Sequence, residues 1–147
     1  MVTDKKANQR LKLILLIEDN DDDILLTKLA LSEISNPPHL LAIKNGKEAI
    51  DYLLDDNNQQ PSLTLVDLKL PIIDGISVIE MITKNENLRS MPLVVLTTSL
   101  EPNDIKRCYQ ANINSYLQKP VDFERFKILV RKTVEYWLEL NIPASRN

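Results

Sequence analysis

Short apolar runs alternate along the chain with longer segments in which apolar residues recur at helical spacing. Short continuous apolar runs are typical of parallel strands that are covered on both faces of a sheet. The strands predicted in this way, the last of them brief, lie at 13–17, 40–43, 63–66, 93–96 and 115–118. Because each strand is followed by a helical segment, the alternation predicts an α/β domain whose parallel sheet carries helices on both faces.

The helical segments have recognisable ends. The first helix is expected to start at a cap provided by Asn20 or Asp21 and to end near Ile34, before two prolines. The last is expected from about Asp122 to Leu138. The residues expected to face the core are Ile24, Leu25 and Leu29 in the first helix, Ala49, Ile50, Leu53 and Leu54 in the second, Val78, Ile79 and Ile82 in the third, Ile105, Cys108 and Tyr109 in the fourth, and Phe126, Val130, Val134 and Trp137 in the fifth.

The length of 147 residues predicts one domain, with tails at 1–11 and 139–147 and the folded part at 12–138. The composition, 44% hydrophobic and 27% charged with a net charge of -3, is that of an ordinary soluble protein and argues against a general nucleic-acid binder. The single Cys108 cannot form an internal disulfide, so a cytoplasmic location is expected. No apolar stretch reaches the roughly 18 residues that span a bilayer.

Polar residues stand where four of the predicted strands end. Glu18 and Asp19 follow the first strand, Asp67 follows the third, Thr97 closes the fourth and Lys119 follows the fifth. The carboxyl ends of parallel strands are where open α/β sheets bind ligands, so these side chains are expected to converge. The chain has only two glycines, which excludes Gly-rich phosphate loops and the dinucleotide fingerprint.

The residue types at this edge favour phosphoryl chemistry. Three clustered carboxylates repel one another, and a divalent cation with oxygen ligands, Mg²⁺, resolves that repulsion. An aspartate beside such a cation can accept a phosphoryl group as an aspartyl phosphate. A hydroxyl and an ammonium group suit the phosphoryl oxygens, because phosphoryl transfer rests mainly on positioning and electrostatics.

With these residues in place, the segment 12–138 resembles the receiver domain of two-component response regulators. The resemblance implies a flavodoxin-like (βα)5 fold, a doubly wound five-stranded parallel sheet in the order 2-1-3-4-5. The residues that carry it are Glu18-Asp19, Asp67 in the motif VDLKLP, Asp74-Gly75, Thr97, Tyr116, and Lys119 before a proline, Pro120, that is typically cis in the family.

The family assigns a role to each of these positions. By resemblance, Asp67 accepts a phosphoryl group from a sensor histidine kinase, while Asp19, Asp67 and the backbone carbonyl of Lys69 ligate Mg²⁺ and Glu18 acts on the ion mainly through water. Glu18 replaces the more usual aspartate. Thr97 and Tyr116 are the expected switch, which changes the surface of the fourth helix, fifth strand and fifth helix. Lys69 and Ser99 occupy positions that tune the phosphate lifetime.

A narrower resemblance concerns the segment LTTS and the terminal residues 136–139. They are similar to small stand-alone regulators that are paired with phytochrome-type histidine kinases and often form homodimers. The chain ends soon after the fifth helix, so no output domain is expected. Trp137 is interpreted either as the last core residue of its helix or as an interface residue.

Other interpretations remain beside the receiver. A phosphohydrolase of the haloacid dehalogenase type needs a second aspartate two residues after the first, where this chain has Lys69, so a turnover enzyme is not expected. A receiver-like binding module that is never phosphorylated is the other alternative. The acids Asp21–Asp23 are assigned to the helix dipole and solvent with no metal role, and His39 to an exposed position.

Overall fold

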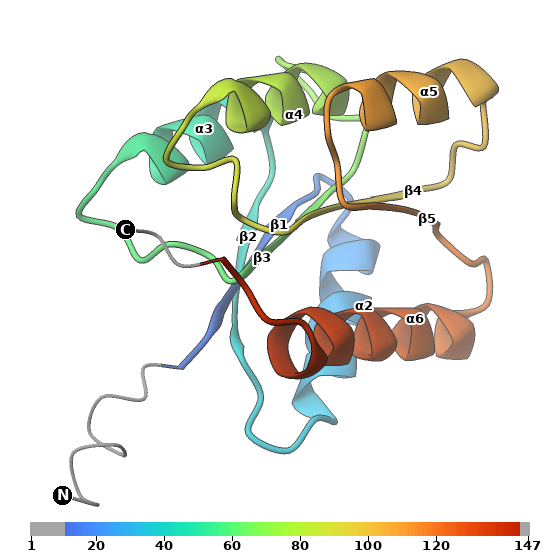
Figure 1. Cartoon of the computed structure of the whole chain (residues 1–147). Coiled ribbons are helices and arrows are strands. Elements are labelled where there is room, and N and C mark those ends of the chain that lie inside the picture. Colours follow the sequence, from blue (N-terminus) through green and yellow to red (C-terminus); the bar gives the residue numbers. More distant parts are fainter. Residues whose placement is uncertain (1–10, 145–147) are drawn as a thin grey trace, which may run out of the picture.

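A five-stranded parallel sheet forms the centre of the computed structural model, which describes residues 11–144 (Figure 1). The strand order is β2-β1-β3-β4-β5, which confirms the doubly wound flavodoxin-like sheet. The predicted tail at 1–11 lies outside the described residues except for its last member. The strands are β1 Leu13–Ile17, β2 His39–Ile43, β3 Leu63–Val66, β4 Leu93–Thr97 and β5 Ser115–Gln118.

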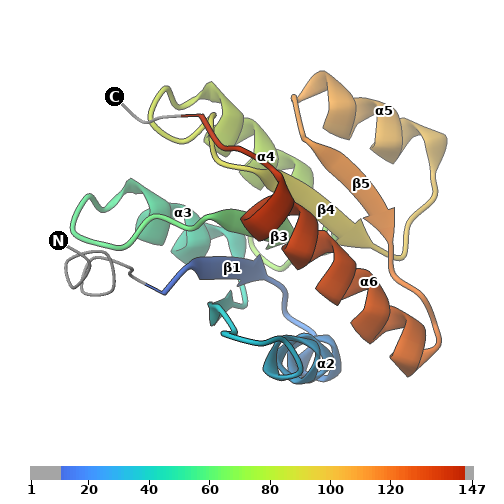
Figure 2. The same ribbon diagram turned by 60° about the horizontal axis from the view of Figure 1, so that its bottom comes forward.

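Helices cover both faces of the sheet. Figures 1 and 2 show α3, α4 and α5 on one face and α2 and α6 on the other. A short π-helical turn, η1, continues α6 from Tyr136 to Leu140, so residues 139 and 140 belong to this turn and not to a tail. The helices are α2 Asp21–Ser32, α3 Gly46–Leu54, α4 Gly75–Lys84, α5 Pro102–Gln110 and α6 Phe123–Glu135.

Alternate residues of each central strand enter two separate apolar cores. Leu15 and Ile17 of β1 face the core beneath α3, α4 and α5, whereas Ile14 and Leu16 face the core beneath α2 and α6. Both faces of β1, β3 and β4 are buried, which explains why their residues are apolar apart from the threonines Thr64 and Thr97. The strand interiors therefore leave functional polar groups only at their ends.

Three predicted helix faces, those of α2, α3 and α5, were wrong in part. Leu25 and Leu29 of α2 are 55% and 45% exposed, because α2 packs closely on α6 through another face of the helix. The buried residues of α2 are Ile24, Thr27, Ala30 and Leu31. Leu54 is 53% exposed because it is the last residue of α3, where the packed face of the helix ends. In α5 Cys108 is buried as predicted, but Tyr109 is half-exposed on the outer side.

The end of α6 is tied to the start of β1. Lys12 Nζ donates a hydrogen bond to the Leu138 carbonyl oxygen, and Leu138 is buried. Trp137 is half-buried and packs against the core beneath α2 and α6, with the Tyr136 ring edge-on at 5.0 Å between centroids. Within residues 11–144 none of the helices has the length and apolar character to cross a membrane.

Candidate functional site

Backbone hydrogen bonds at the carboxyl edge of the sheet bring the predicted polar residues together. The Glu18 amide donates to the Ile43 carbonyl oxygen at 3.0 Å, and the Asp67 amide donates to the Ile17 carbonyl oxygen at 3.0 Å. The Lys119 amide donates to the Thr97 carbonyl oxygen at 2.7 Å. Each side chain thus projects one residue beyond a paired strand, where the sheet places it without help from the loops.

Three acidic side chains form one cluster at this edge. Single carboxylate oxygens of Glu18, Asp19 and Asp67 all lie within 4.8 Å of one another. Glu18 and Asp67 are buried and Asp19 is exposed. The Oε2 atom of Glu18 is buried and has no hydrogen-bond partner among the described residues, although a buried acceptor ordinarily finds one. This orphaned oxygen and the all-oxygen ligand set fit a hard divalent cation.

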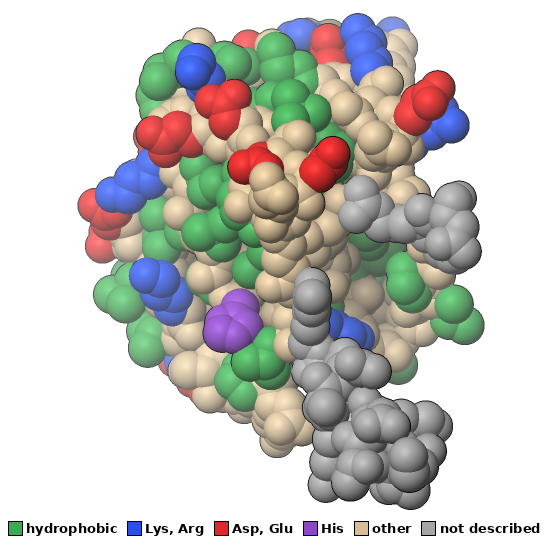
Figure 3. All heavy atoms as spheres, turned by 90° about the vertical axis from the view of Figure 1, so that its left-hand side faces the viewer, with side chains coloured by type: hydrophobic (Ala, Val, Ile, Leu, Met, Phe, Trp, Pro, Cys, Tyr) green, Lys and Arg blue, Asp and Glu red, His purple; other side chains and the backbone are tan. Residues whose placement is uncertain are grey.

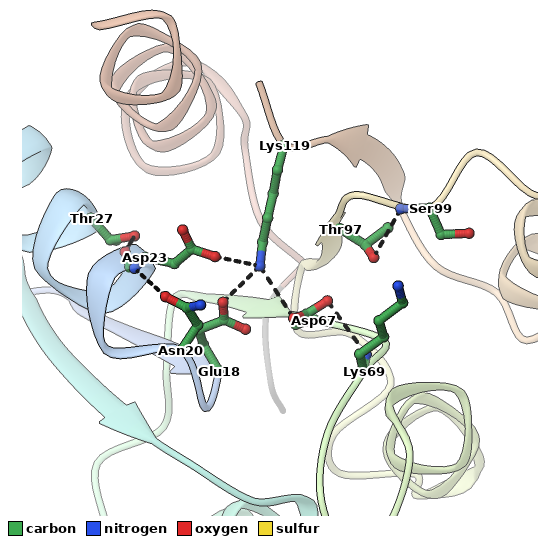
Figure 4. Close-up of polar contacts among 9 residues, drawn as sticks. All are labelled: Glu18, Asn20, Asp23, Thr27, Asp67, Lys69, Thr97, Ser99 and Lys119. Carbon is green, nitrogen blue, oxygen red and sulfur yellow. Dashed lines mark hydrogen bonds and ion pairs between the residues drawn. The ribbon is translucent and has the colours of Figure 1, made fainter. Parts of the chain in front are cut away.

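Lys119 lies at the centre of the site (Figure 4). Its Nζ atom is 2.6 Å from Glu18 Oε1, 2.8 Å from Asp23 Oδ2 and 3.2 Å from Asp67 Oδ2. These contacts use all three donors of the ammonium group. The assignment of Asp23 to solvent was therefore wrong, because its carboxylate turns back from α2 to the edge of the sheet.

The cap of α2 explains the position of Asp23. Asn20 is the N-cap, and its side chain accepts a hydrogen bond from the Asp23 amide at 3.0 Å. This bond places Asp23 at the third helical position, on the side of the first turn that faces Lys119. Asp21 instead pairs with the exposed Lys44, so the three consecutive acids have different environments.

The site holds more negative than positive charge. Burial, followed by the hydrogen bond with Asp67, raises the pKa of Glu18 to about 9 even though Lys119 acts in the opposite direction. Burial also disfavours the charged form of Lys119, but its hydrogen bonds to Asp23 and Glu18 outweigh this and raise its pKa. For Asp23, burial is outweighed by the hydrogen bond to Lys119, which lowers its pKa. Without a cation, burial therefore favours the protonated form of Glu18 at neutral pH.

The predicted switch residues meet through the loop after β4. Thr97 is fully buried, and its Oγ1 accepts a long hydrogen bond of 3.4 Å from the Ser99 amide. The Tyr116 hydroxyl donates to the Ser99 carbonyl oxygen at 2.8 Å. Ser99 Oγ donates in turn to Asp104 at the start of α5 at 2.7 Å, a contact that sequence reasoning missed. Ser99 therefore joins Thr97, Tyr116 and α5.

The loop between β3 and α4 passes close to the carboxylate of Asp67, the predicted acceptor. The Lys69 amide donates to Asp67 Oδ1 at a long 3.4 Å, which places the Lys69 backbone beside the cluster. The Gly75 amide donates to the Leu68 carbonyl oxygen at 2.9 Å, and a Cβ atom on Gly75 would lie 2.3 Å from the Asp67 carbonyl oxygen. Only glycine fits here, because this backbone approach leaves no room for a side chain.

Backbone strain is stored in the same loop. Ile72 has a φ of 70° and is 76% exposed, in a three-residue turn closed by a 2.8 Å bond from the Ile73 amide to the Pro71 carbonyl oxygen. A β-branched residue seldom adopts this conformation. The described residues contain no cis peptide bond, so the Lys119-Pro120 bond is trans and the expectation of a cis proline was wrong.

Other polar residues lie outside the site. His39 is exposed at the start of β2, as predicted, far from the carboxyl edge. Cys108 is buried, and burial raises the pKa of its thiol to about 11, so it behaves as a core residue. Acidic and basic side chains are interspersed on the face shown in Figure 3, without a broad basic patch there.

Comparison with known proteins gives a consistent result. The sequence pattern of the response regulator receiver domain matches residues 14–131. The probable methanogenesis regulatory protein FilR2 of Methanothrix harundinacea is 39% identical over 132 residues, which cover 88% of this chain and 85% of that protein. The response regulator Rcp1 of Synechocystis is 33% identical over 139 residues, covering 91% of this chain and 95% of that protein.

Solved structures are similar over nearly the same length. The phosphorylated cyanobacterial phytochrome response regulator RcpA superposes with a TM-score of 0.87 at 33% identity. The match covers 92% of this chain and 100% of that chain. The Mn²⁺-bound form of Rcp1 superposes with a TM-score of 0.85 at 32% identity, covering 91% of this chain and 99% of that chain.

Proposed function

The chain belongs to the family of response regulator receiver domains, and we propose that Asp67 is the residue on which it accepts a phosphoryl group. Receiver domains are signalling proteins that pair with histidine kinases and are generally not turnover enzymes. The observation that carries the proposal is the position of Lys119 Nζ, 3.2 Å from Asp67 Oδ2 and beside an acidic cluster. It gives the acceptor an ammonium group ready to neutralise phosphoryl oxygens.

A divalent cation, which we take to be Mg²⁺, completes this site. We assign its binding to Asp19, Asp67 and the Lys69 backbone carbonyl, with Glu18 acting on it through water. The unpartnered Glu18 Oε2 and the mutual closeness of the three carboxylates support this assignment. When bound, the cation neutralises charge that develops on the phosphoryl oxygens.

The protein's own residues orient the transfer. The bond between phosphorus and a phosphohistidine nitrogen breaks, its electron pair returns to the imidazole, and a bond forms between phosphorus and an Asp67 carboxylate oxygen. Lys119 donates to one phosphoryl oxygen, and Thr97 Oγ1, buried at the end of β4, donates to another. Release to water later breaks the same acyl phosphate, which is the only hydrolysis we propose for this chain.

Thr97 and Tyr116 relay the change. When Thr97 turns towards a phosphoryl group it gives up its bond from the Ser99 amide, and the loop that holds the Tyr116 hydroxyl is released. Tyr116 is half-buried, so its ring has room to rotate inward as Thr97 moves. The surface that changes is built by α5, β5 and α6, the elements that follow β4.

The partner we propose is a phytochrome-type histidine kinase in the cytoplasm. The similarity to RcpA, described as a cyanobacterial phytochrome response regulator, supports this pairing. We also propose a homodimer formed by the end of the chain, because Tyr136, Leu140 and Ile142 are exposed apolar residues beside Trp137. Their exposed fractions of 50%, 65% and 91% form an apolar surface suited to burial against a second copy.

Acetyl phosphate with Mg²⁺ tests the acceptor directly. Intact mass and a phosphate-affinity gel are expected to show one added phosphoryl group on wild type and none on Asp67→Asn. The matched control is Asp74→Asn, which changes an exposed helix cap seven residues away and should retain labelling. An unlabelled wild type would leave the phosphorylation-independent binding module, and continuous phosphate release from unrelated phosphomonoesters would favour a hydrolase.

Sedimentation tests the dimer separately. Wild type is expected to sediment as a dimer and Trp137→Ala as a monomer, whereas Leu25→Ala, on the exposed side of α2, should behave as wild type. A monomeric wild type would refute the dimer and leave the acceptor proposal intact.

A further inference from the structure

Asp23 binds Lys119 although it lies outside the carboxylate cluster that fits a cation. Its Oδ2 is 2.8 Å from Lys119 Nζ, while the clustered oxygens belong to Glu18, Asp19 and Asp67. The position of Asp23 is fixed twice, by the Asn20 cap and by a 2.7 Å bond from Thr27 Oγ1 to the Asp23 carbonyl oxygen. The side chain is 24% exposed, so this ion pair is largely shielded from solvent.

The donors of Lys119 limit what the ammonium group can hold at one time. All three are engaged in the unphosphorylated site, and a phosphoryl oxygen needs one of them. Figure 4 shows Asp23 on one side of Lys119 and Thr97 on the other side, beyond Asp67. A phosphoryl group on Asp67 that is held by both Thr97 and Lys119 therefore draws the ammonium group away from Asp23.

We propose that Asp23 is a positioning residue that restrains Lys119 in the unphosphorylated state and thereby slows phosphorylation of Asp67. This inference rests on the proposed function of Asp67 as acceptor. Two effects act in the same direction: the ion pair must weaken as the phosphoryl group arrives, and the Asp23 carboxylate repels the added negative charge. Asp23 thus keeps the site biased towards its unphosphorylated form.

The same ion pair has an opposite effect on the cation. By holding part of the charge of Lys119, Asp23 leaves Asp67 freer to ligate a divalent ion and leaves Glu18 freer to accept a hydrogen bond from water on that ion. Loss of Asp23 strengthens their pairing with Lys119, so cation affinity falls. A residue that only supported the helix would not speed phosphorylation and weaken cation binding together.

The test compares Asp23→Asn and Asp23→Ala with a matched control in the same turn. Asp22→Asn removes the same charge from an exposed side chain for which the structure shows no ion pair. At saturating Mg²⁺, the initial rate of phosphorylation by acetyl phosphate is expected to rise about three- to tenfold in both Asp23 variants. This factor corresponds to the loss of one charge-assisted hydrogen bond that is partly exposed to solvent. The Mg²⁺ dissociation constant, from titration calorimetry, should rise about two- to fivefold.

Asp22→Asn is expected to match wild type in both measurements. Asp23→Glu, which keeps the charge, should return the rate towards that of wild type. Asp23 variants that are phosphorylated no faster than Asp22→Asn would overturn this inference while wild-type labelling upheld the acceptor. If wild type itself were unlabelled, the acceptor proposal and this inference would fall together. Circular dichroism checks folding, and Asp23→Asn, nearly isosteric with the native residue, remains decisive if Asp23→Ala unfolds.

Discussion

Glu18→Gln is expected to make the cation-free protein more stable at pH 8 and to remove most of its pH dependence. The native residue is 1% exposed, and its pKa is raised to about 9 from an ordinary value of 4.5, chiefly by burial. Between these two values the folded state keeps a proton that the unfolded state has lost. The free energy of unfolding therefore falls as pH rises through this range.

The size of the effect follows from the same two pKa values. Each pH unit between them changes the free energy of unfolding by about 1.4 kcal/mol, so the loss from pH 5.5 to pH 8 is about 3 kcal/mol. The shifts of Asp23 and Lys119 do not oppose this change between about pH 5.5 and pH 8. The lowered pKa of Asp23 stabilises the fold at every pH above its ordinary 3.8, and the raised pKa of Lys119 stabilises it at every pH below its ordinary 10.5.

Urea unfolding at pH 5.5 and pH 8 with a chelator measures the difference. We expect the wild type to lose about 3 kcal/mol between the two conditions and the Gln variant to change little, with Asp22→Asn following wild type. Saturating Mg²⁺ should raise wild-type stability more at pH 8 than at pH 5.5, because the cation favours the ionised carboxylate. If the free energy of unfolding changed with pH equally in wild type and in Glu18→Gln, both measured with chelator, Glu18 would not be the group that causes the pH dependence.

Three further substitutions test the site at other points. Lys119→Met should lower the free energy of unfolding in urea by about 3 to 5 kcal/mol, because it leaves buried carboxylates without a cationic partner. The double variant with Glu18→Gln should recover part of this loss, and additive losses would argue against the ion pair. Gly75→Ala should lower the free energy of unfolding by about 2 kcal/mol and slow the phosphorylation of Asp67, because its Cβ would lie 2.3 Å from the Asp67 carbonyl oxygen. Normal phosphorylation at full stability would contradict this. Ile72→Asn should stabilise the fold by about 1 kcal/mol in thermal unfolding, since Asn tolerates a positive φ. Ile72→Val is the control that keeps the strain, and an equal gain in stability in both variants would refute the explanation.

Most of the sheet, and the convergence of the candidate site residues at its edge, could be predicted from the sequence because both depend on strand ends. A buried parallel strand is largely apolar, although β3 holds the buried Thr64, so polar residues that close or follow such a run mark the edge of the sheet. Asp67 follows Val66 and Thr97 closes β4 in this way. The strand order came from family resemblance, because the positions of the strands do not state which of them are neighbours.

The errors lie where tertiary packing chooses between equivalent residues. The sequence ILLTKLAL of α2 has apolar residues on every side, so contact with α6 decides that Ala30 and Leu31 are buried and Leu25 is not. Three consecutive acids likewise give no sign of which one turns inward. The helix phase set by the Asn20 cap makes that choice, and it selects Asp23.

The unfavourable features of this domain gather at one edge of the sheet, and that distribution has a consequence for engineering. The two cores are apolar, and four helices have N-caps, Asn20, Asn45, Asp74 and Asp122, whose side chains accept from the first turn. The orphaned Glu18 oxygen instead lies in the acidic cluster, and the strained Ile72 lies in the loop that follows Asp67. A stabilising change at a functional site tends to lower activity, whereas one elsewhere does not. Glu18→Gln should therefore gain stability and lose cation affinity, because the buried negative charge that is costly without a cation is the same charge that would attract one.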